Sequence, residues 1–524
     1  MVSKNLFKSA GSSKKEIKAV NTVNNAGGTA YTLDEKAALA QLAMTGCFNG
    51  TFYVDAKDQL KEVINLANKL PVEFVAKLAV YSRQKGLMKD MPAVLTAVVA
   101  SRDTNLLSKI FPKTIDNPKM VRNFVQVIRS GVTGRKSLGT RPKKLIQNYL
   151  NGLTDEQLFK ADVGNSPSLQ DIIKLARPKP GNKNRSALYA YLLSKEFNQD
   201  DLCSLVKEYE VFKKEMGYEI PDVPFQMLTA LPLTDSHWKK IAGNATWNQI
   251  RMNLNTFARH SVLKDTKMVN VLAERLSDST QIQKAKVFPY QLLAAFKNAN
   301  EDVPQKLTNA LQKAADASLE NVPALTGSIK VLVDVSGSMS NPATGDRGSV
   351  TSKMRCVDVA GLMAAAVMRK NDDAEIYPFD TKVHSHKLNP MDSIMTNAET
   401  LARFGGGGTD CSGALAHLNN KKDKGDLVIY VSDNESWVDS TPNSYYASRG
   451  TKTMEEWNKY KARNPKAKLV CIDITPNKTT QAHNREDILN IGGFSDQVFD
   501  VIAQFQELGN SKDLWIQTIE SVVL

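Results

Sequence analysis

The sequence lacks the features that mark membrane proteins, disulfide-rich secreted proteins and zinc proteins. In its 524 residues no run of about 18 apolar residues occurs, and the N-terminus MVSKNLFKSAGSSKKE has no apolar core of a signal peptide. The six histidines form no HExxH motif. The five cysteines are odd in number and include no CxxC pair: Cys47, Cys203, Cys356, Cys411 and Cys471. We therefore expect a soluble, cytoplasmic protein whose cysteines are reduced and buried.

What is present is a globular composition on a chain too long for one core. Hydrophobic residues make up 42% of the chain and charged residues 23%, which excludes bulk disorder, collagen and coiled coil. Because 524 residues exceed what a single hydrophobic core usually holds, we expect at least two domains.

The net charge of +13 is unevenly distributed. Residues 1–327 hold 46 Lys and Arg against 30 Asp and Glu, whereas residues 328–524 hold 22 against 25. The excess is densest over residues 101–150, with 11 basic and 2 acidic side chains. A solvated basic surface is the simpler explanation of a modest excess, but this density favours binding of a polyanion such as nucleic acid.

Residues 31–327 show the apolar spacing of helices, with short breaks at Gly, Pro, Asn or Asp. This array has no dominant apolar block, so it favours a solenoid of helix pairs over a single bundle. Residues 1–30, basic and rich in Asn, Ser and Gly, are expected to form a weakly ordered arm. The clearest helical segments are residues 34–46, 72–86, 119–131, 141–152, 169–176, 247–260 and 303–321.

Residues 328–524 alternate between strands and helices. Continuous apolar strands separated by helices predict a doubly wound α/β domain with a mainly parallel sheet, whose ligands bind beyond the carboxyl ends of the strands. The helix between the first two strands is expected over residues 352–370. The strands are expected at residues 328–336, 374–380, 426–433 and 468–475.

Hydroxyl and carboxylate side chains follow three of these segments. The first strand ends in a DxSxS motif, Asp334, Ser336 and Ser338; the glycines 405–408 lead into Thr409, and a later strand ends at Asp433. A serine-rich turn that caps a helix would explain DxSxS alone, but not the matching placement of the other two. Such hard oxygen ligands suit Mg²⁺ or another divalent cation.

With these residues the domain resembles a von Willebrand factor A domain with a metal-ion-dependent adhesion site. The resemblance implies that Ser336, Ser338 and Thr409 supply hydroxyl ligands, and that Asp334 and Asp433 act directly or through water. No His, Cys or activated Ser pair near these residues in the sequence suggests a nucleophile and base, so we expect a non-catalytic protein.

Two basic stretches of the helical part are the candidates for RNA contact. Residues 129–144 form a Gly- and Ser-rich loop that runs into a helix, and residues 166–185 end a helix at a proline-rich turn. Cations in the first turn of a helix are unfavourable unless an anion such as phosphate binds there. The candidate side chains are Arg135, Lys136, Arg141, Lys143, Lys144, Lys174, Arg177, Lys179, Lys183 and Arg185.

The order GRKSLGTRPKKLIQNYLNG, SLQDIIKLARPKP and then a metal-site A domain resembles the Ro autoantigen family, of a bacterial or phage-borne type. The resemblance implies a ring of HEAT-like repeats, the TROVE module, over residues 31–327, closed by the A domain at residues 328–524. It also implies a monomeric ribonucleoprotein that binds Y-like noncoding RNA outside the ring and single-stranded 3′ ends of defective RNA in its hole. A 3′-to-5′ exoribonuclease would be a partner in RNA quality control.

The same resemblance aligns Lys160, Lys174 and Arg177 with basic or histidine positions of the Y RNA surface. The chain departs from the family at Gly164, where a cation is common, and at Leu169, where histidine is frequent. Two other functions compete with RNA binding. One is an Mg²⁺-dependent adhesion or assembly module; the other, a metal-dependent nuclease, is weaker because the clustered carboxylates of two-metal chemistry are missing from the motif.

Overall fold

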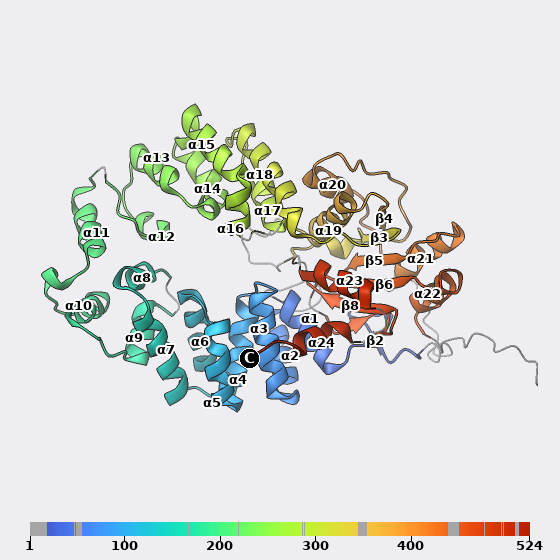
Figure 1. The fold of residues 1–524 in the computed structure, drawn as a ribbon, viewed down its shortest axis with the longest axis horizontal. Coiled ribbons are helices and arrows are strands. Elements are labelled where there is room, and N and C mark those ends of the chain that lie inside the picture. The colour runs from blue at the N-terminus through green and yellow to red at the C-terminus, as the bar shows by residue number, and fades with distance from the viewer. Residues whose placement is uncertain are drawn as a thin grey trace, which may run out of the picture.

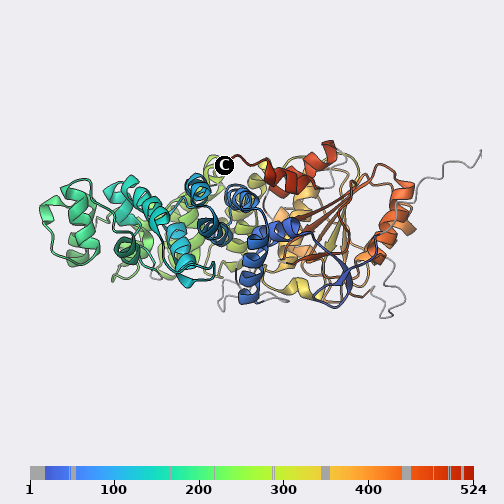
Figure 2. The same ribbon diagram turned by 90° about the horizontal axis from the view of Figure 1, so that it is seen from below.

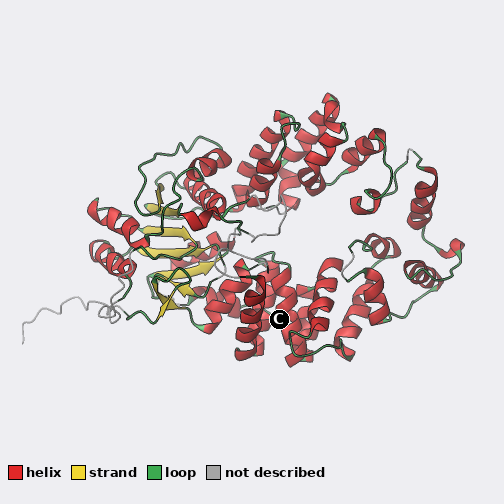
Figure 3. Ribbon diagram, turned by 180° about the vertical axis from the view of Figure 1, so that it is seen from behind, coloured by secondary structure: helices red, strands yellow, loops and turns green. Residues whose placement is uncertain are grey.

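The computed structural model describes residues 18–46, 48, 55–164, 167–217, 219–285, 287, 289–343, 354–438, 450–475, 477–493, 495, 497–508 and 513–524. Helices follow a curved path around a centre, and an α/β domain lies between the two ends of that path (Figure 1). All the longer strands belong to this one domain (Figure 3), and the molecule is flat when viewed edge-on (Figure 2). The expected ring of helices followed by an α/β domain is confirmed.

Eighteen helices make up the described part of the curved path, and neighbouring helices pack in pairs. Their bounds are α1 Glu35–Thr45, α2 Ala56–Lys69, α3 Val72–Gln84, α4 Asp90–Arg102, α5 Thr104–Thr114, α6 Pro118–Ser130, α7 Thr140–Gly152, α8 Asp155–Lys160, α9 Leu169–Ala176, α10 Lys183–Leu192, α11 Ser204–Glu215, α12 Phe225–Leu228, α13 Asp235–Asn244, α14 Trp247–Arg259, α15 Thr266–Ser277, α16 Ser279–Ala285, α17 Pro289–Asn298 and α18 Gln305–Ser318.

Helix α6 illustrates why these segments are helical. Asn117 caps the helix by accepting a hydrogen bond from Met120 N at 3.0 Å, and Pro118 occupies the first turn, where no intrahelical partner is lost. Gly131 ends the helix in the left-handed conformation at φ 83°. Between these signals one face is buried, including Phe124, whose replacement by Ala would cost about 3–5 kcal/mol.

The α/β domain has a five-stranded parallel sheet in the order β4-β3-β5-β6-β8. Helices α19, α20 and α23 cover one face, and α21 and α22 cover the other. The order in which successive strands are added to the sheet reverses between β3 and β5, and ligands bind at such a switch point in this kind of fold. The bounds are β3 Ile329–Asp334, α19 Cys356–Lys370, β4 Glu375–Phe379, α20 Ile394–Leu401, α21 Cys411–Asn420, β5 Leu427–Ser432, α22 Lys452–Arg463, β6 Lys468–Asp473, β8 Ile488–Gly492, α23 Gln497–Leu508 and α24 Leu514–Glu520.

The expectation of a weakly ordered arm over residues 1–30 is wrong for residues 18–30, and residues 1–17 lie outside the described part. Strands β1 (Thr22–Val23) and β2 (Thr29–Thr32) form a hairpin, and β2 pairs antiparallel with β7 (Thr479–Thr480) of the α/β domain. Backbone pairing with a distant segment orders this stretch despite its polar composition. The N-terminal segment is therefore joined to the α/β domain.

Among the described residues Cys203, Cys356, Cys411 and Cys471 form no disulfide, and Cys47 lies outside the described part. Among the described helices none is both long and apolar enough to cross a membrane.

Candidate functional site

The DxSxS motif lies at the carboxyl end of β3, beside the end of β5. Ser336 N donates to Asp334 Oδ1 at 2.9 Å, and the hydroxyls of Ser336 and Ser338 lie 3.2 Å apart. The hydroxyl of Ser432, the last residue of β5, donates to the other Asp334 oxygen. A hydrogen bond from Ser338 also reaches Asp433. The structure thus brings together four of the five predicted metal ligands.

The glycine run brings Thr409 to the same edge of the sheet. Gly337 N donates to Gly407 O at 2.9 Å, and Gly406 N donates to Val335 O at 3.0 Å. Only glycine fits at position 405, because φ is +85° and a Cβ atom there would lie 1.8 Å from Val335 O. Thr409 then lies against the loop after β5, where its carbonyl accepts from Trp437 N at 3.2 Å.

The two central carboxyls are almost fully buried, with Asp334 0% and Asp433 2% exposed. Burial, and then the charge of Asp433, raises the pKa of Asp334 to about 7 although Ser336 and Ser432 donate to it. Burial also raises the pKa of Asp433 to about 6, against the Ser338 hydrogen bond and with help from Glu435. In the described part of the chain no Lys or Arg forms an ion pair with either carboxyl. Two buried acids without a cation are the environment that a divalent ion would neutralise.

The donor set fits a hard divalent cation. Three hydroxyls and two carboxylates from separate loops offer oxygen ligands only, which suits Mg²⁺. Within the described ranges no group of three His, Cys, Asp or Glu side chains lies close enough to hold a metal. The candidate therefore depends on Ser336, Ser338 and Thr409.

The N-terminal hairpin also reaches this edge, which the sequence reasoning missed. Asn25 Nδ2 donates to Glu435 Oε1 at 2.9 Å, and Ala26 N donates to Glu435 Oε2 at 3.3 Å. Asn24 Nδ2 donates to Ser436 O at 2.7 Å. Residues 24–26 thus hold the loop that carries Asp433. The signal was the Asn- and Gly-rich turn of residues 24–28, which lies between the β-branched pair Thr22-Val23 and the strand-forming run Thr29–Thr32.

Most of the predicted RNA contacts are exposed. In the described residues, no ion pair engages Lys136, Arg141, Lys143, Lys144, Lys174, Arg177 or Lys179. Lys160 forms an ion pair with Asp222 at 2.7 Å, and Lys183 forms one with Asp201 at 3.0 Å. Surface pairs of this kind contribute little to stability, so either lysine could exchange its partner for a phosphate.

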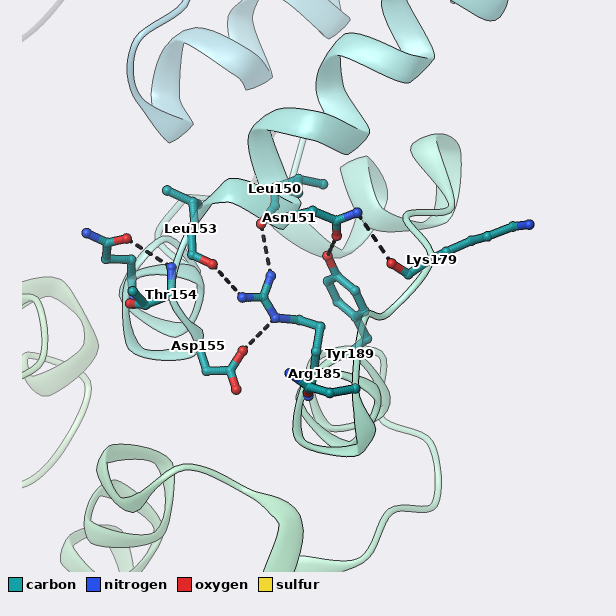
Figure 4. A network of polar contacts seen from close by, with 10 residues as sticks. Leu150, Asn151, Leu153, Thr154, Asp155, Lys179, Arg185 and Tyr189 are labelled. Atoms are coloured by element: carbon teal, nitrogen blue, oxygen red, sulfur yellow. Dashed lines mark hydrogen bonds and ion pairs between the residues drawn. The ribbon is translucent and has the colours of Figure 1, made fainter.

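The prediction of RNA contact is corrected for Arg185, which is only 9% exposed. Its guanidinium donates to Leu150 O at 3.0 Å, to Leu153 O and to Asp155, so it ties the end of α7 to α8 and α10 (Figure 4). In the same view the Lys179 side chain points away from this network. Arg135 is also structural, because it donates to Ala100 O at 2.7 Å and Leu138 O at 3.0 Å.

A groove of about 540 Å³ runs between α6 and α9 beside Lys174. Its charged lining residues are Arg129, Lys174 and Asp171. Hydrogen bonds from Ser168 lower the pKa of Asp171, and the charges of Lys174 and Arg129 lower it further. The groove therefore presents two cations and one ionised carboxylate, a net positive surface.

A second set of cations, missed from the sequence, comes from opposite sides of the ring. Lys89 precedes α4 and Arg251 lies in α14; these helices belong to different arcs of the helical path (Figure 1). Surrounding protein lowers the pKa of Lys89 by desolvation, and Lys119, Arg83 and Arg251 lower it further. The Lys89 side chain is nevertheless exposed.

The Arg251 side chain is partly buried. Burial lowers the pKa of Arg251, and within the described residues only its Nη1 donates a hydrogen bond, to Gln291 O at 3.0 Å. Its Nε has no hydrogen-bond partner among the described residues. Among the neighbours of Lys89, Arg83 forms an ion pair with Asp116 at 2.8 Å. The cluster thus holds more positive charge than its acidic neighbours neutralise.

The chain is similar to known proteins over most of its length. Residues 329–506 match the family model described as the Ro60 vWA domain. The RNA-binding protein RO60 of Deinococcus radiodurans is 24% identical over 539 aligned positions, which cover 92% of this chain and 94% of that protein. The crystal structure of the Deinococcus radiodurans RO (RSR) protein matches with a TM-score of 0.61 at 17% identity, covering 90% of this chain and 99% of that one.

Proposed function

We propose that this chain, which belongs to the bacterial type of the Ro family, is a non-catalytic RNA-binding ring. Its relative from Deinococcus radiodurans is named an RNA-binding protein. The observation that carries the proposal is the cluster of Lys89, Lys119 and Arg251, in which cations of opposite arcs lie close enough to lower the pKa of Lys89. Such mutual repulsion is relieved when a polyanion enters.

The central cluster favours a single strand of RNA. Because the charges of Lys89 and Arg251 act on one another across the ring, we infer that a single-stranded 3′ end fits between them better than a wider duplex. Phosphates would neutralise the cations that lack acidic partners. The affinity should fall with salt, because the release of counter-ions from the RNA becomes less favourable. We infer that the centre takes single-stranded ends of structured RNA, for handling by an exoribonuclease.

The groove between α6 and α9 favours a second, structured RNA. Arg129 and Lys174 line it, and the exposed Arg177 and Lys179 follow at the end of α9. Arg177 adopts the left-handed conformation with φ 51°, so the chain turns sharply there and presents both side chains beyond the helix. We propose that a Y-like noncoding RNA binds here through its backbone.

We also propose that the sheet edge binds Mg²⁺. Ser336, Ser338 and Thr409 would supply hydroxyl ligands, and Asp334 and Asp433 would supply charge directly or through water. The support is the pair of buried carboxyls with raised pKa values and no cationic partner in the described part of the protein. Bound Mg²⁺ would provide an electrophilic site for an acidic or phosphate group of a ligand.

Competition binding of two RNAs to the full chain tests the RNA proposal. The Lys89→Ala, Lys119→Ala variant should lose affinity for a duplex with a single-stranded 3′ tail, and the Lys174→Ala, Arg177→Ala variant should lose affinity for a hairpin RNA. All four side chains are exposed, so folding should persist. Lys267→Ala, an exposed lysine of α15, is the matched control.

Three outcomes decide between the alternatives. Selective loss of one ligand per variant supports two RNA surfaces. Equal weakening of both ligands by both variants would leave one shared basic surface. No measurable RNA affinity, together with Mg²⁺-dependent capture of a protein, would replace the proposal with an adhesion module.

A further inference from the structure

We propose that a cavity between α12, α13 and α14 binds one unstacked nucleobase of the RNA strand. The cavity has a volume of about 360 Å³, near the lower end of the range for small-molecule sites, about 300–1,000 Å³. Helices α12 and α14 lie on the side of the helical path that borders the centre (Figures 1 and 3). The inference rests on the proposed function, because it needs a single strand in the centre.

One wall of the cavity is apolar and partly aromatic. Phe225, Leu228, Ile241 and Phe257 line it. The ring of Phe225 is held edge-on by the buried Trp238, with ring centroids 5.3 Å apart. A rigid aromatic side chain at the wall of a cavity suits a flat heteroaromatic ring, since unpaired RNA bases are commonly bound by stacking on such groups.

The polar part of the lining consists of three carboxamides, from Asn244, Gln249 and Asn253. Gln249 Oε1 accepts from Thr246 N at 2.7 Å, and Asn253 Nδ2 donates to Gln249 O at 2.8 Å. Among the described residues no hydrogen bond engages Gln249 Nε2, Asn253 Oδ1 or the Asn244 side-chain amide. This part of the lining therefore offers both donors and acceptors, which is the pattern that the edges of bases require.

The backbone of α14 is interrupted where this polar part of the lining forms. Asn253 has φ −120° and ψ 16° inside an otherwise helical segment. The residues at positions 249, 253 and 257 all line the cavity, whereas Arg251 of the same helix belongs to the central cluster. A strand whose phosphates bind at Arg251 would thus pass along the helix that carries the carboxamides.

The charges around the cavity favour an uncharged ligand group. Among the described residues of the lining Asp222 is the only charged one, and its carboxylate is paired with Lys160 at 2.7 Å. No cation of the lining could hold a phosphate or carboxylate inside. A base attached to a strand that is bound elsewhere satisfies both conditions, because the base is neutral and its phosphate remains outside.

The test uses the full chain and uncharged nucleosides as probes, followed by an RNA tail. Binding of adenosine, guanosine, cytidine and uridine is measured by equilibrium dialysis. Asn253→Ala should weaken binding of the preferred nucleoside roughly fivefold, since a hydrogen bond contributes about 1 kcal/mol. The cavity-filling Ala245→Leu should weaken it at least as much, because the larger side chain takes up space that the base would occupy. Asn248→Ala is the control, because this exposed amide of α14 does not line the cavity.

The RNA tail separates this inference from the proposed function. In a single-stranded tail, replacing bases by abasic sites should weaken binding to the native chain but not to the Ala245→Leu variant. Nucleoside binding that is absent, or equal in all variants, would overturn the inference. If the tail binds normally in that case, the RNA function stands; if the tail does not bind the native chain at all, the proposed function fails first.

Discussion

Replacing Asp334 with Asn should have opposite effects on stability without and with Mg²⁺. In the metal-free protein the Asp334 carboxyl is buried beside Asp433 and has a pKa of about 7. The amide of Asn removes this charge but keeps both contacts: its oxygen still accepts from Ser336 N, and its NH₂ can donate to the Ser432 hydroxyl. The variant should therefore be more stable than the native chain when no metal is bound.

The size and sign of the effect follow from the pKa shift. The pKa of Asp334 is raised from 3.8 to about 7 in the folded state, so the folded state holds more protons than the unfolded state between these values. The contribution of this group to the free energy of unfolding is fully present below about pH 4 and is lost as the pH rises through 7. One pKa unit is worth about 1.4 kcal/mol, which makes the cost at pH 8 on the order of a few kcal/mol.

Mg²⁺ should reverse this cost in the native chain alone. A ligand at 100 times its Kd stabilises by about 2.7 kcal/mol. For an α/β domain of this size, about 2–4 °C of Tm per kcal/mol gives an increase of roughly 5–10 °C. The increase should grow from pH 6 to pH 8, because the metal binds the ionised carboxyls.

The assay is thermal unfolding of the full chain by circular dichroism at pH 6 and pH 8, with and without Mg²⁺. Asp372→Asn, an exposed acid of the same domain, is the control and should behave as the native chain does. An Asp334→Asn variant that is less stable without metal, or that retains the full Mg²⁺ response, would refute the reasoning.

Three further outcomes are expected. Replacing Lys143 and Lys144 with Ala should flatten the dependence of log K on log salt by up to about 0.7 per lost phosphate contact in a titration of single-stranded RNA, and an unchanged slope would place the RNA elsewhere. Replacing Asn25 with Ala should lower both the Tm and the Mg²⁺ affinity, measured by calorimetry, because Glu435 loses a hydrogen bond while buried; unaltered Mg²⁺ affinity would make the hairpin purely structural. Replacing Arg185 with Ala should destabilise the protein by about 3–5 kcal/mol in chemical unfolding, with RNA affinity of the folded protein unchanged; a loss of RNA affinity at full stability would restore it as an RNA contact.

The fold and the metal-site candidates could be predicted from the sequence because both are encoded locally. The fully buried strands β3 and β5 appear as continuous apolar runs, and a parallel sheet necessarily places their carboxyl ends on one edge. The motif at Asp334 and the residue Asp433 therefore had to come together once the sheet was recognised. Thr409 follows α20 rather than a strand, and the hydrogen bonds of the glycine run bring it to the same edge.

The central cations could not be predicted in this way. Lys89 and Arg251 are separated by more than 160 positions in the sequence, and neither belongs to a recognisable motif. Their proximity depends on how far the helical path curves, which is set by the sum of small rotations between packed helices. The same holds for β2, whose partner β7 comes from the other end of the chain.

Part of the basic charge of the helical half belongs to the fold, which explains why charge density alone misassigned Arg135 and Arg185. Four arginines share one role: each donates to a carbonyl in the last turn of a helix 32 to 35 residues earlier, where a cation also faces the negative helix end. The pairs are Arg102 with Ala67, Arg135 with Ala100, Arg185 with Leu150 and Arg275 with Gly243. This spacing is a structural repeat that the apolar pattern does not reveal. An arginine at this spacing from the last turn of a helix is thus better assigned to the solenoid, and the exposed lysines that share the same basic stretches, such as Lys144 and Lys179, are the better candidates for RNA.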